Sequence, residues 1–110
     1  MSQPLYQKVC VACEGGTPPL DLDKINLFLK ETPTWTVVDG VKITKNFAFK
    51  NFAEALAFTN QVGQIAETEN HHPDIFIHSW NKADITLSAH ALKGLSENDF
   101  IVASKIDRLN

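Results

Sequence analysis

Six polar or aromatic residues in the C-terminal half of this 110-residue chain are of types and at positions that could bind a small molecule or move a proton. Their order is Glu67, three residues, His71-His72-Pro73, six residues, Trp80, nine residues, His90, eight residues and Asp99. The imidazole side chain is both a common metal ligand and a proton carrier near neutral pH. The histidines are therefore candidates for a metal site or for acid–base catalysis.

Residue types alone leave both chemical interpretations of these histidines open. Adjacent histidines point in different directions, whereas helical zinc sites place their histidines four residues apart. Imidazole suits proton transfer on an uncharged or aromatic substrate at neutral pH. Glu67 and His71 are four residues apart, so a helix continued to His71 would stack their side chains on one face.

Each candidate also has a structural interpretation. An imidazolium near a helix C-terminus is favoured by the helix dipole, so His71 and His72 could serve only to close a helix. Asp99 suits the third position of a capping box, and Trp80 suits hairpin packing. His78, the fourth histidine, lies beside bulky apolar residues and is predicted to be structural.

Hydrophobic periodicity predicts three helices that position these residues. Capping residues and helical spacing place them over residues 21–30, 51–70 and 96–109. Pro33 and Pro73 end the first two. The apolar stripe of the second helix includes Phe52, Leu56 and Gly63, and the glycine indicates close packing against a sheet.

Two β-hairpins are predicted between the helices, with strands over 35–38, 41–50, 75–80 and 83–90. Asp39-Gly40 is a strong hairpin turn, and Asn81-Lys82 is the turn expected in the second hairpin. Lys45 is the one exception on the apolar side of its strand, and His90 ends the polar side of the last strand. Helices that cover one face of an antiparallel sheet give an α+β fold.

Cys10 and Cys13 are the only cysteines, and they lie in an N-terminal segment, residues 1–19, that is predicted to be a loop. Such a pair could supply half of a zinc site or a redox dithiol. A glycine- and proline-rich run follows the pair instead of a helix. The sequence therefore favours reduced, non-catalytic cysteines in a tethered segment.

Composition predicts one soluble, cytoplasmic domain over residues 20–110. The chain is 44% hydrophobic and 21% charged, with a net charge of −3. It has no lysine- or arginine-rich run, which argues against nucleic-acid binding. It also has no secretory signal pattern and no apolar segment near the roughly 18 to 20 residues that span a membrane.

The spaced set from Glu67 to Asp99 resembles the signature of the pterin-4a-carbinolamine dehydratase family. The resemblance extends through Ile85-Thr86-Leu87-Ser88 and Gly94-Leu95-Ser96-Glu97, and more loosely to the Cys-Val-Ala-Cys-Glu-Gly-Gly opening. It implies a four-stranded antiparallel sheet with three helices on one face, in a dimer or tetramer. It also implies dehydration of 4a-hydroxytetrahydropterin to quinonoid dihydropterin, which recycles the pterin of aromatic amino-acid hydroxylases. No metal or organic cofactor is implied, which favours proton transfer.

The resemblance also implies catalytic roles for three histidines. By similarity, His71 and His90 are the acid candidates on opposite sides of the pterin. His72 would bind the ring and take the proton from N5. Which histidine is the acid and which is the base stays open.

The substrate-binding set implied by the resemblance has five members. Glu67 would keep His71 protonated or bind the amide edge of the pterin. Ser88 and Ala89 would lend strand backbone groups to the flat heterocycle. Asp99 would orient His90 or only cap its helix, and Trp80 completes the set.

A non-catalytic role is the main rival. Some relatives with this fold act as dimerisation partners of transcription factors or as assembly chaperones, and some of those lack catalytic residues. This chain keeps the full histidine set, which favours an enzyme.

Overall fold

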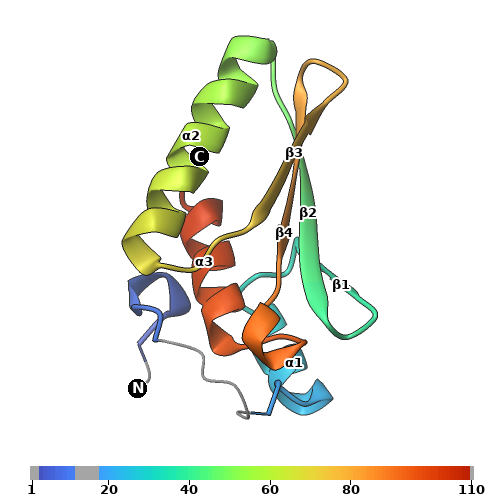
Figure 1. Cartoon of the computed structure of the whole chain (residues 1–110), viewed down its shortest axis with the longest axis vertical. Coiled ribbons are helices and arrows are strands. Elements are labelled where there is room, and N and C mark those ends of the chain that lie inside the picture. The colour runs from blue at the N-terminus through green and yellow to red at the C-terminus, as the bar shows by residue number, and fades with distance from the viewer. Residues whose placement is uncertain (1–2, 12–17, 110) are drawn as a thin grey trace.

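The computed structural model describes residues 3–11 and 18–109. The described part of the chain is an α+β domain in which two hairpins alternate with helices (Figure 1), as predicted. Its elements are η1 (Leu5–Gln7), α1 (Leu22–Leu29), β1 (Thr36–Val38), β2 (Lys42–Ala48), α2 (Phe52–Glu69), β3 (Asp74–His78), β4 (Lys82–Leu87), η2 (His90–Leu92) and α3 (Glu97–Asp107).

The four strands form one antiparallel sheet in the order β1-β2-β4-β3. The two hairpins join through β2 and β4, where Ile43 pairs with Leu87 and Phe47 pairs with Ala83. α2 and α3 lie side by side against one face of this sheet (Figure 1). Alternation along β4 directs Ile85 and Leu87 to the helices and leaves the residues between them on the open face.

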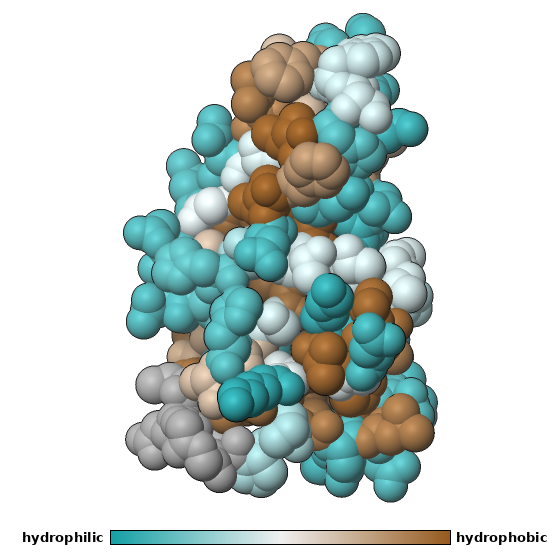
Figure 2. All heavy atoms as spheres, turned by 45° about the vertical axis from the view of Figure 1, so that its right-hand side comes forward, coloured by the Kyte–Doolittle hydropathy of each residue, from teal (hydrophilic) through white to brown (hydrophobic). Residues whose placement is uncertain are grey.

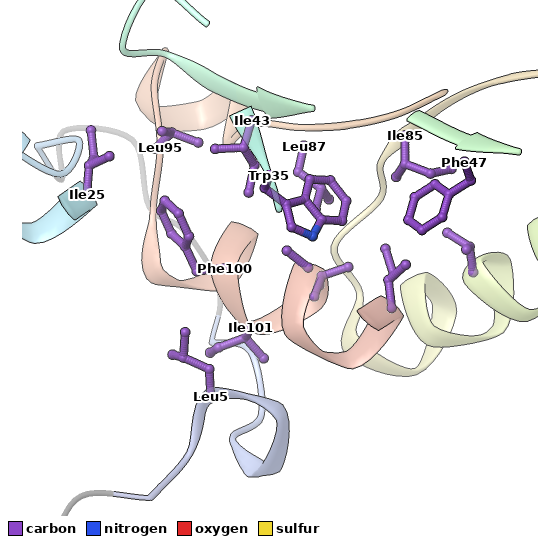
Figure 3. Packing of buried hydrophobic residues seen from close by; sticks show 14 of the residues in the cluster. Leu5, Ile25, Trp35, Ile43, Phe47, Ile85, Leu87, Leu95, Phe100 and Ile101 are labelled. Atoms are coloured by element: carbon purple, nitrogen blue, oxygen red, sulfur yellow. The ribbon is translucent and has the colours of Figure 1, made fainter. Parts of the chain in front are cut away.

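The hydrophobic core lies between the sheet and α3. The first turns of α3 are buried on nearly every side, because the helix packs against η1, α1 and α2, and its apolar side chains share the core with those of the sheet. Figure 3 shows apolar side chains from all these elements converging on the helix. The largest contributors are Leu5, Trp35, Ile43, Phe47, Phe58, Ile85, Leu87, Leu95, Phe100 and Ile101.

Capping residues begin all three long helices where the sequence predicts. The Asp21 and Asn51 side chains each accept a hydrogen bond of 2.9 Å from the backbone N–H three residues on. Ser96 and Asp99 form a capping box, in which the Asp99 carboxylate accepts the Ser96 N–H at 2.9 Å. The start of α3 is thereby fixed, and Asp99 is completely buried there.

Lys45, the exception in the apolar row of β2, has a partner inside the fold. Its Nζ lies 2.8 Å from Asp107 Oδ1 and 4.9 Å from the centre of the Phe47 ring. The indole N–H of Trp35 also donates to Asp107, at 3.1 Å. A charge on this side of the sheet is tolerated because it is paired and hydrogen-bonded.

Three details of the predicted elements are wrong. The second hairpin turns at Ser79 and Trp80, with φ of 51° and 56°, so β3 ends at His78, before the predicted turn. No atom lies within 4 Å of a Cβ built on Gly63, so this glycine does not mark close packing. Phe52 and Leu56 are 49% and 41% exposed, because the buried stripe of α2 runs through Ala55, Phe58, Thr59, Val62 and Ala66 instead.

The N-terminal segment is more ordered than a loop where it is described. Leu5 is 1% exposed and belongs to the core, and Figure 3 shows it beside Ile101. The backbone of η1 is held by Glu31, which accepts the Leu5 N–H at 3.0 Å, and by Lys105, which donates to the Tyr6 carbonyl at 3.1 Å. Cys13 lies outside the described residues. No helix in the described ranges is long and apolar enough to cross a membrane.

Candidate active site

A cavity of about 450 Å³ opens where α2 ends, β4 leaves the sheet and α3 begins. Its fourth wall is the N-terminal strap, which we define as residues 8–11. The cavity is lined by His71, His72 and His90 together with Ser88 and Ala89. We call it the histidine cavity. Its volume is in the range of small-molecule sites.

The end of α2 sets the direction of the two adjacent histidines. Asn70 closes the helix in the left-handed region, with φ of 52° and ψ of 43°, a conformation that asparagine tolerates better than most residues. The chain therefore leaves the helix before His71, whose N–H bonds to the Ala66 carbonyl at 3.1 Å. The predicted stacking of Glu67 on His71 is wrong, because His71 is no longer helical.

His71 is held by the buried carboxylate at the start of α3. Its Nε2 lies 2.6 Å from Asp99 Oδ1, and the two side chains are only 12% and 0% exposed. The other oxygen of Asp99 accepts the Ser96 N–H in the capping box. This bond uses Nε2 of the ring, so Nδ1 is the ring nitrogen left for a ligand. Of the two roles predicted for Asp99, capping of its helix is confirmed, although the carboxylate also bonds to His71, and orientation of His90 is wrong.

His72 pairs with Glu67 one turn earlier on α2, through its Nε2 and Glu67 Oε2. Both side chains are mostly exposed, so this pair contributes little to stability and acts mainly to orient the imidazole. Glu67 therefore reaches the histidine cavity through His72, and it is not itself among the lining residues.

His90 lies in a turn and not at the end of a strand. β4 ends at Leu87, Ala89 bridges to Gly94 with an N–H to carbonyl bond of 2.8 Å, and His90 begins η2. This reversal brings an exposed imidazole to the cavity from a segment separate from α2. Ser88 and Ala89 reach the cavity through the same irregular end of β4.

Trp80 and His78 lie away from this site. Trp80 is 64% exposed in the β3–β4 turn, and it does not line the cavity. His78 belongs to β3 and lies 3.1 Å from Asp84 on the neighbouring strand. The structure therefore brings three of the four histidines together and leaves the fourth on the sheet.

Six lining residues were missed by sequence reasoning: Cys10, Val11, Glu69, Asn70, Ala91 and Asn98. The Glu69 side chain is 7% exposed, and it accepts the Cys10 N–H at 2.8 Å and lies 3.4 Å from Lys105 Nζ. Glu69 lies two residues before His71 in the sequence, so its position could have predicted that it belongs to the site. No sequence pattern near residues 8–11 predicts that the N-terminal strap contacts this end of the fold. Among residues 3–11 and 18–109, no three His, Cys, Asp or Glu side chains are arranged to hold a metal ion.

Cys10 presents a protonated thiol to the cavity. Burial raises the pKa of this thiol from 9.0 to about 12, and the negative charge of Glu69 adds to the shift. Its Sγ lies 3.7 Å from the carbonyl of Asn98. The thiol is thus a small, poorly nucleophilic group at neutral pH.

We expect Cys10 to be alkylated by iodoacetamide at about pH 8 at least about tenfold more slowly in the folded protein than in urea. The loss of thiolate at the raised pKa outweighs its greater intrinsic nucleophilicity. The raised folded pKa also means that the thiol contributes stability below pH 9.0, which is lost as the pH rises towards about 12. Mass spectrometry of a Cys13→Ser variant measures Cys10 alone, and equal rates in the two states would contradict the assignment.

Comparison with known proteins gives the same family from sequence and from structure. The sequence model of the family described as pterin 4 alpha carbinolamine dehydratase matches residues 18–109. A relative from Rubrobacter xylanophilus, named "Putative pterin-4-alpha-carbinolamine dehydratase", is 47% identical over 105 residues, which cover 96% of this chain and 97% of the relative. A relative of the same name from Alkaliphilus metalliredigens is 46% identical over 105 residues, 94% of each chain.

Two solved structures share the fold. A transcriptional coactivator/pterin dehydratase from Brucella melitensis matches with a TM-score of 0.75 and 35% identity, over 82% of this chain and 96% of its own. A pterin dehydratase-like protein, described as a RuBisCO assembly factor in the alpha-carboxysome, matches with a TM-score of 0.58 and 27% identity, over 69% of this chain and 88% of its own. The extent of the sequence match and the identity of the relatives show that the chain belongs to the pterin 4 alpha carbinolamine dehydratase family.

Proposed function

We propose that this protein dehydrates 4a-hydroxytetrahydropterin to quinonoid dihydropterin by histidine acid–base catalysis. The observation that carries the proposal is the convergence on one cavity of His71 and His72, which follow α2, and of His90, which follows β4. Family membership supports the same reaction class. The product becomes the tetrahydropterin of aromatic amino-acid hydroxylases again only after a separate two-electron reduction, so the proposed role is one step of cofactor recycling in the cytoplasm.

The reaction requires one proton donated and one removed. A protonated imidazole gives its proton to the C4a hydroxyl, and the C–O bond breaks with release of water. A neutral imidazole takes the proton from N5, and the electron pair of that N–H bond forms the C4a=N5 double bond. The two transfers balance, so the site returns to its starting charge after the histidines exchange protons with water.

The geometry supports distinct tasks for the three histidines. His71, oriented by buried Asp99, would present Nδ1 as one proton-transfer atom. His90 is the alternative acid, and the residues just before it, Ser88 and Ala89, would offer backbone groups to the ring edge. His72, oriented by Glu67, would bind the heterocycle and take the N5 proton. Trp80 would join a substrate site only if a second copy of the chain brought it there.

Stopped-flow decay of 4a-hydroxytetrahydropterin, with and without the protein, tests the proposal directly. We expect the protein to accelerate decay catalytically, and we expect exhaustive chelation to leave the rate unchanged because the proposed steps need only imidazole. A decay rate that does not depend on protein concentration would refute the activity. Loss of activity on chelation, restored by zinc alone, would favour the metal interpretation.

A binding role is the second candidate, because the two structural relatives are described as a coactivator and as an assembly factor.

Large apolar side chains are exposed on α2 and along β3 to its turn, namely Phe52, Leu56, Ile75, Phe76 and Trp80. Figure 2 shows hydrophobic side chains among hydrophilic ones in the upper half of the molecule, where the β3–β4 hairpin lies. We propose that these residues support a homodimer or homotetramer. A monomer in sedimentation velocity would contradict this.

A further inference from the structure

The N-terminal strap lies outside the family's matched region, which begins at residue 18, yet it closes one side of the histidine cavity. Cys10 and Val11 are lining residues in the same cavity as His71 and His90. Catalysis as proposed above assigns no task to this wall. The wall is built from residues 59 to 88 positions away in sequence from the groups that hold it.

The backbone hydrogen bonds described at the cavity end of the strap go to buried side chains. The Cys10 N–H donates to Glu69 Oε1 at 2.8 Å. The Val11 N–H donates to Asn98 Oδ1 at 3.1 Å, and Asn98 Nδ2 donates back to the Val11 carbonyl. Asn98 is 4% exposed, so its amide holds the Val11 backbone as a neighbouring strand would. At the other end of the strap, Lys8 lies 2.6 Å from Glu97.

The residues that hold the strap are neighbours in sequence of those that hold His71. Asn98 precedes Asp99 in the first turn of α3, and Glu69 lies two residues before His71 at the end of α2. Both walls of the cavity therefore share their supports. A shift of the strap relative to the histidines would require rearrangement of buried polar groups, which is costly.

The strap offers an apolar surface to the cavity. The N–H groups of Cys10 and Val11 are bonded to Glu69 and Asn98 and are not available to a ligand, whereas the Val11 side chain lines the cavity. Val11 is 72% exposed and is free to be covered by a ligand. Such a surface suits the face of a flat, uncharged heterocycle and not a charged group.

We propose that Cys10 and Val11 form a substrate-binding wall, and that Asn98 and Glu69 are positioning residues that fix it opposite the histidines. This inference rests on the proposed function for its substrate class, an uncharged pterin. The wall contacts the ring in the ground state and in the transition state alike, so it contributes to KM and leaves kcat to the histidines.

Two variants test the wall by steady-state kinetics. Val11→Ala removes two methyl groups from the surface and is expected to raise KM about three- to tenfold, with kcat within about twofold. Asn98→Ala releases the Val11 backbone and is expected to raise KM at least as much, with Asn98→Asp intermediate because it keeps only the acceptor. Asn46→Ala is the matched control, since Asn46 donates to Asp84 on the sheet, away from the cavity.

Hydrogen exchange separates a wall from a merely structural strap. The amides of Cys10 and Val11 are expected to exchange slowly, to exchange faster in Asn98→Ala, and to be slowed further by 7,8-dihydrobiopterin only in the wild type. Faster exchange in Asn98→Ala with an unchanged KM would overturn the proposal. If Asn98→Ala lowered kcat and left KM unchanged, the proposal would also be overturned, because Asn98 would then act only through Asp99 and not on the wall.

The substrate-binding wall can be tested even if the protein has no dehydratase activity. If the wild type does not accelerate pterin decay, the dissociation constant for 7,8-dihydrobiopterin takes the place of KM. A Val11→Ala variant that binds this pterin as tightly as the wild type overturns the wall even then. If Asn98→Ala does not fold, Val11→Ala still decides, because its side chain is too exposed for the substitution to unfold the protein.

Discussion

Replacing His71 or His90 with alanine is expected to lower kcat for pterin dehydration by about 100- to 10,000-fold, because each removes a positioned proton-transfer group. The fold should survive both changes. His90 is exposed, and His71 lies at the cavity surface and not in the hydrophobic core. Stopped-flow turnover with circular dichroism of each variant measures the two effects separately.

The chain supplies its own matched control. His78 is the histidine that does not line the histidine cavity, so His78→Ala should keep turnover within about twofold. The double variant His71→Ala/His90→Ala is expected to lose less than the product of the single losses, since groups that act together are not additive. Full activity of the double variant would refute the acid–base assignment.

Replacing Leu5 with alanine is expected to lower the free energy of unfolding by about 2 to 5 kcal/mol. Leu5 is 1% exposed and packs against α3 with the rest of the core (Figure 3), so the shorter side chain leaves a cavity that the neighbours fill only in part. Urea denaturation, with the dependence on urea concentration checked for a constant slope, gives the value.

Val9→Ala is the comparison for this change, because Val9 is four residues away and 72% exposed. Its effect should stay within about 0.5 kcal/mol. If Leu5→Ala also cost less than about 1 kcal/mol, the N-terminal segment would be an attachment to the domain and not part of its core.

The parts of the fold that depend on neighbouring residues were predictable. Asp21, Asn51 and Ser96 act within one turn of their own helices, and the Asp39-Gly40 turn has positive φ at both residues, as its type requires. The α+β architecture followed from these signals and was confirmed. Positive φ at Ser79 and Trp80 was not predictable in the same way, since neither residue favours it.

The parts of the site that depend on distant residues were not predictable. The bond from Asp99 to His71 spans 28 residues, and no local pattern distinguishes it from the expected bond to His90. The exit of the chain at Asn70 decided it, because one left-handed residue turns His71 away from Glu67 and towards α3. The wall at Cys10 was missed for the same reason, as its supports lie 59 and 88 residues away.

The two oxygens of Asp99 bind different groups: one bonds to His71, and the other accepts the backbone N–H of Ser96, the residue that caps α3. If the first turn of α3 opened, His71 would therefore lose the carboxylate that orients its ring, even while most of the domain stayed folded. By thermodynamic linkage, a bound pterin that prefers the oriented ring must also protect the helix from opening. Pterin binding at the site and the opening of the first turn of α3 are thus thermodynamically linked.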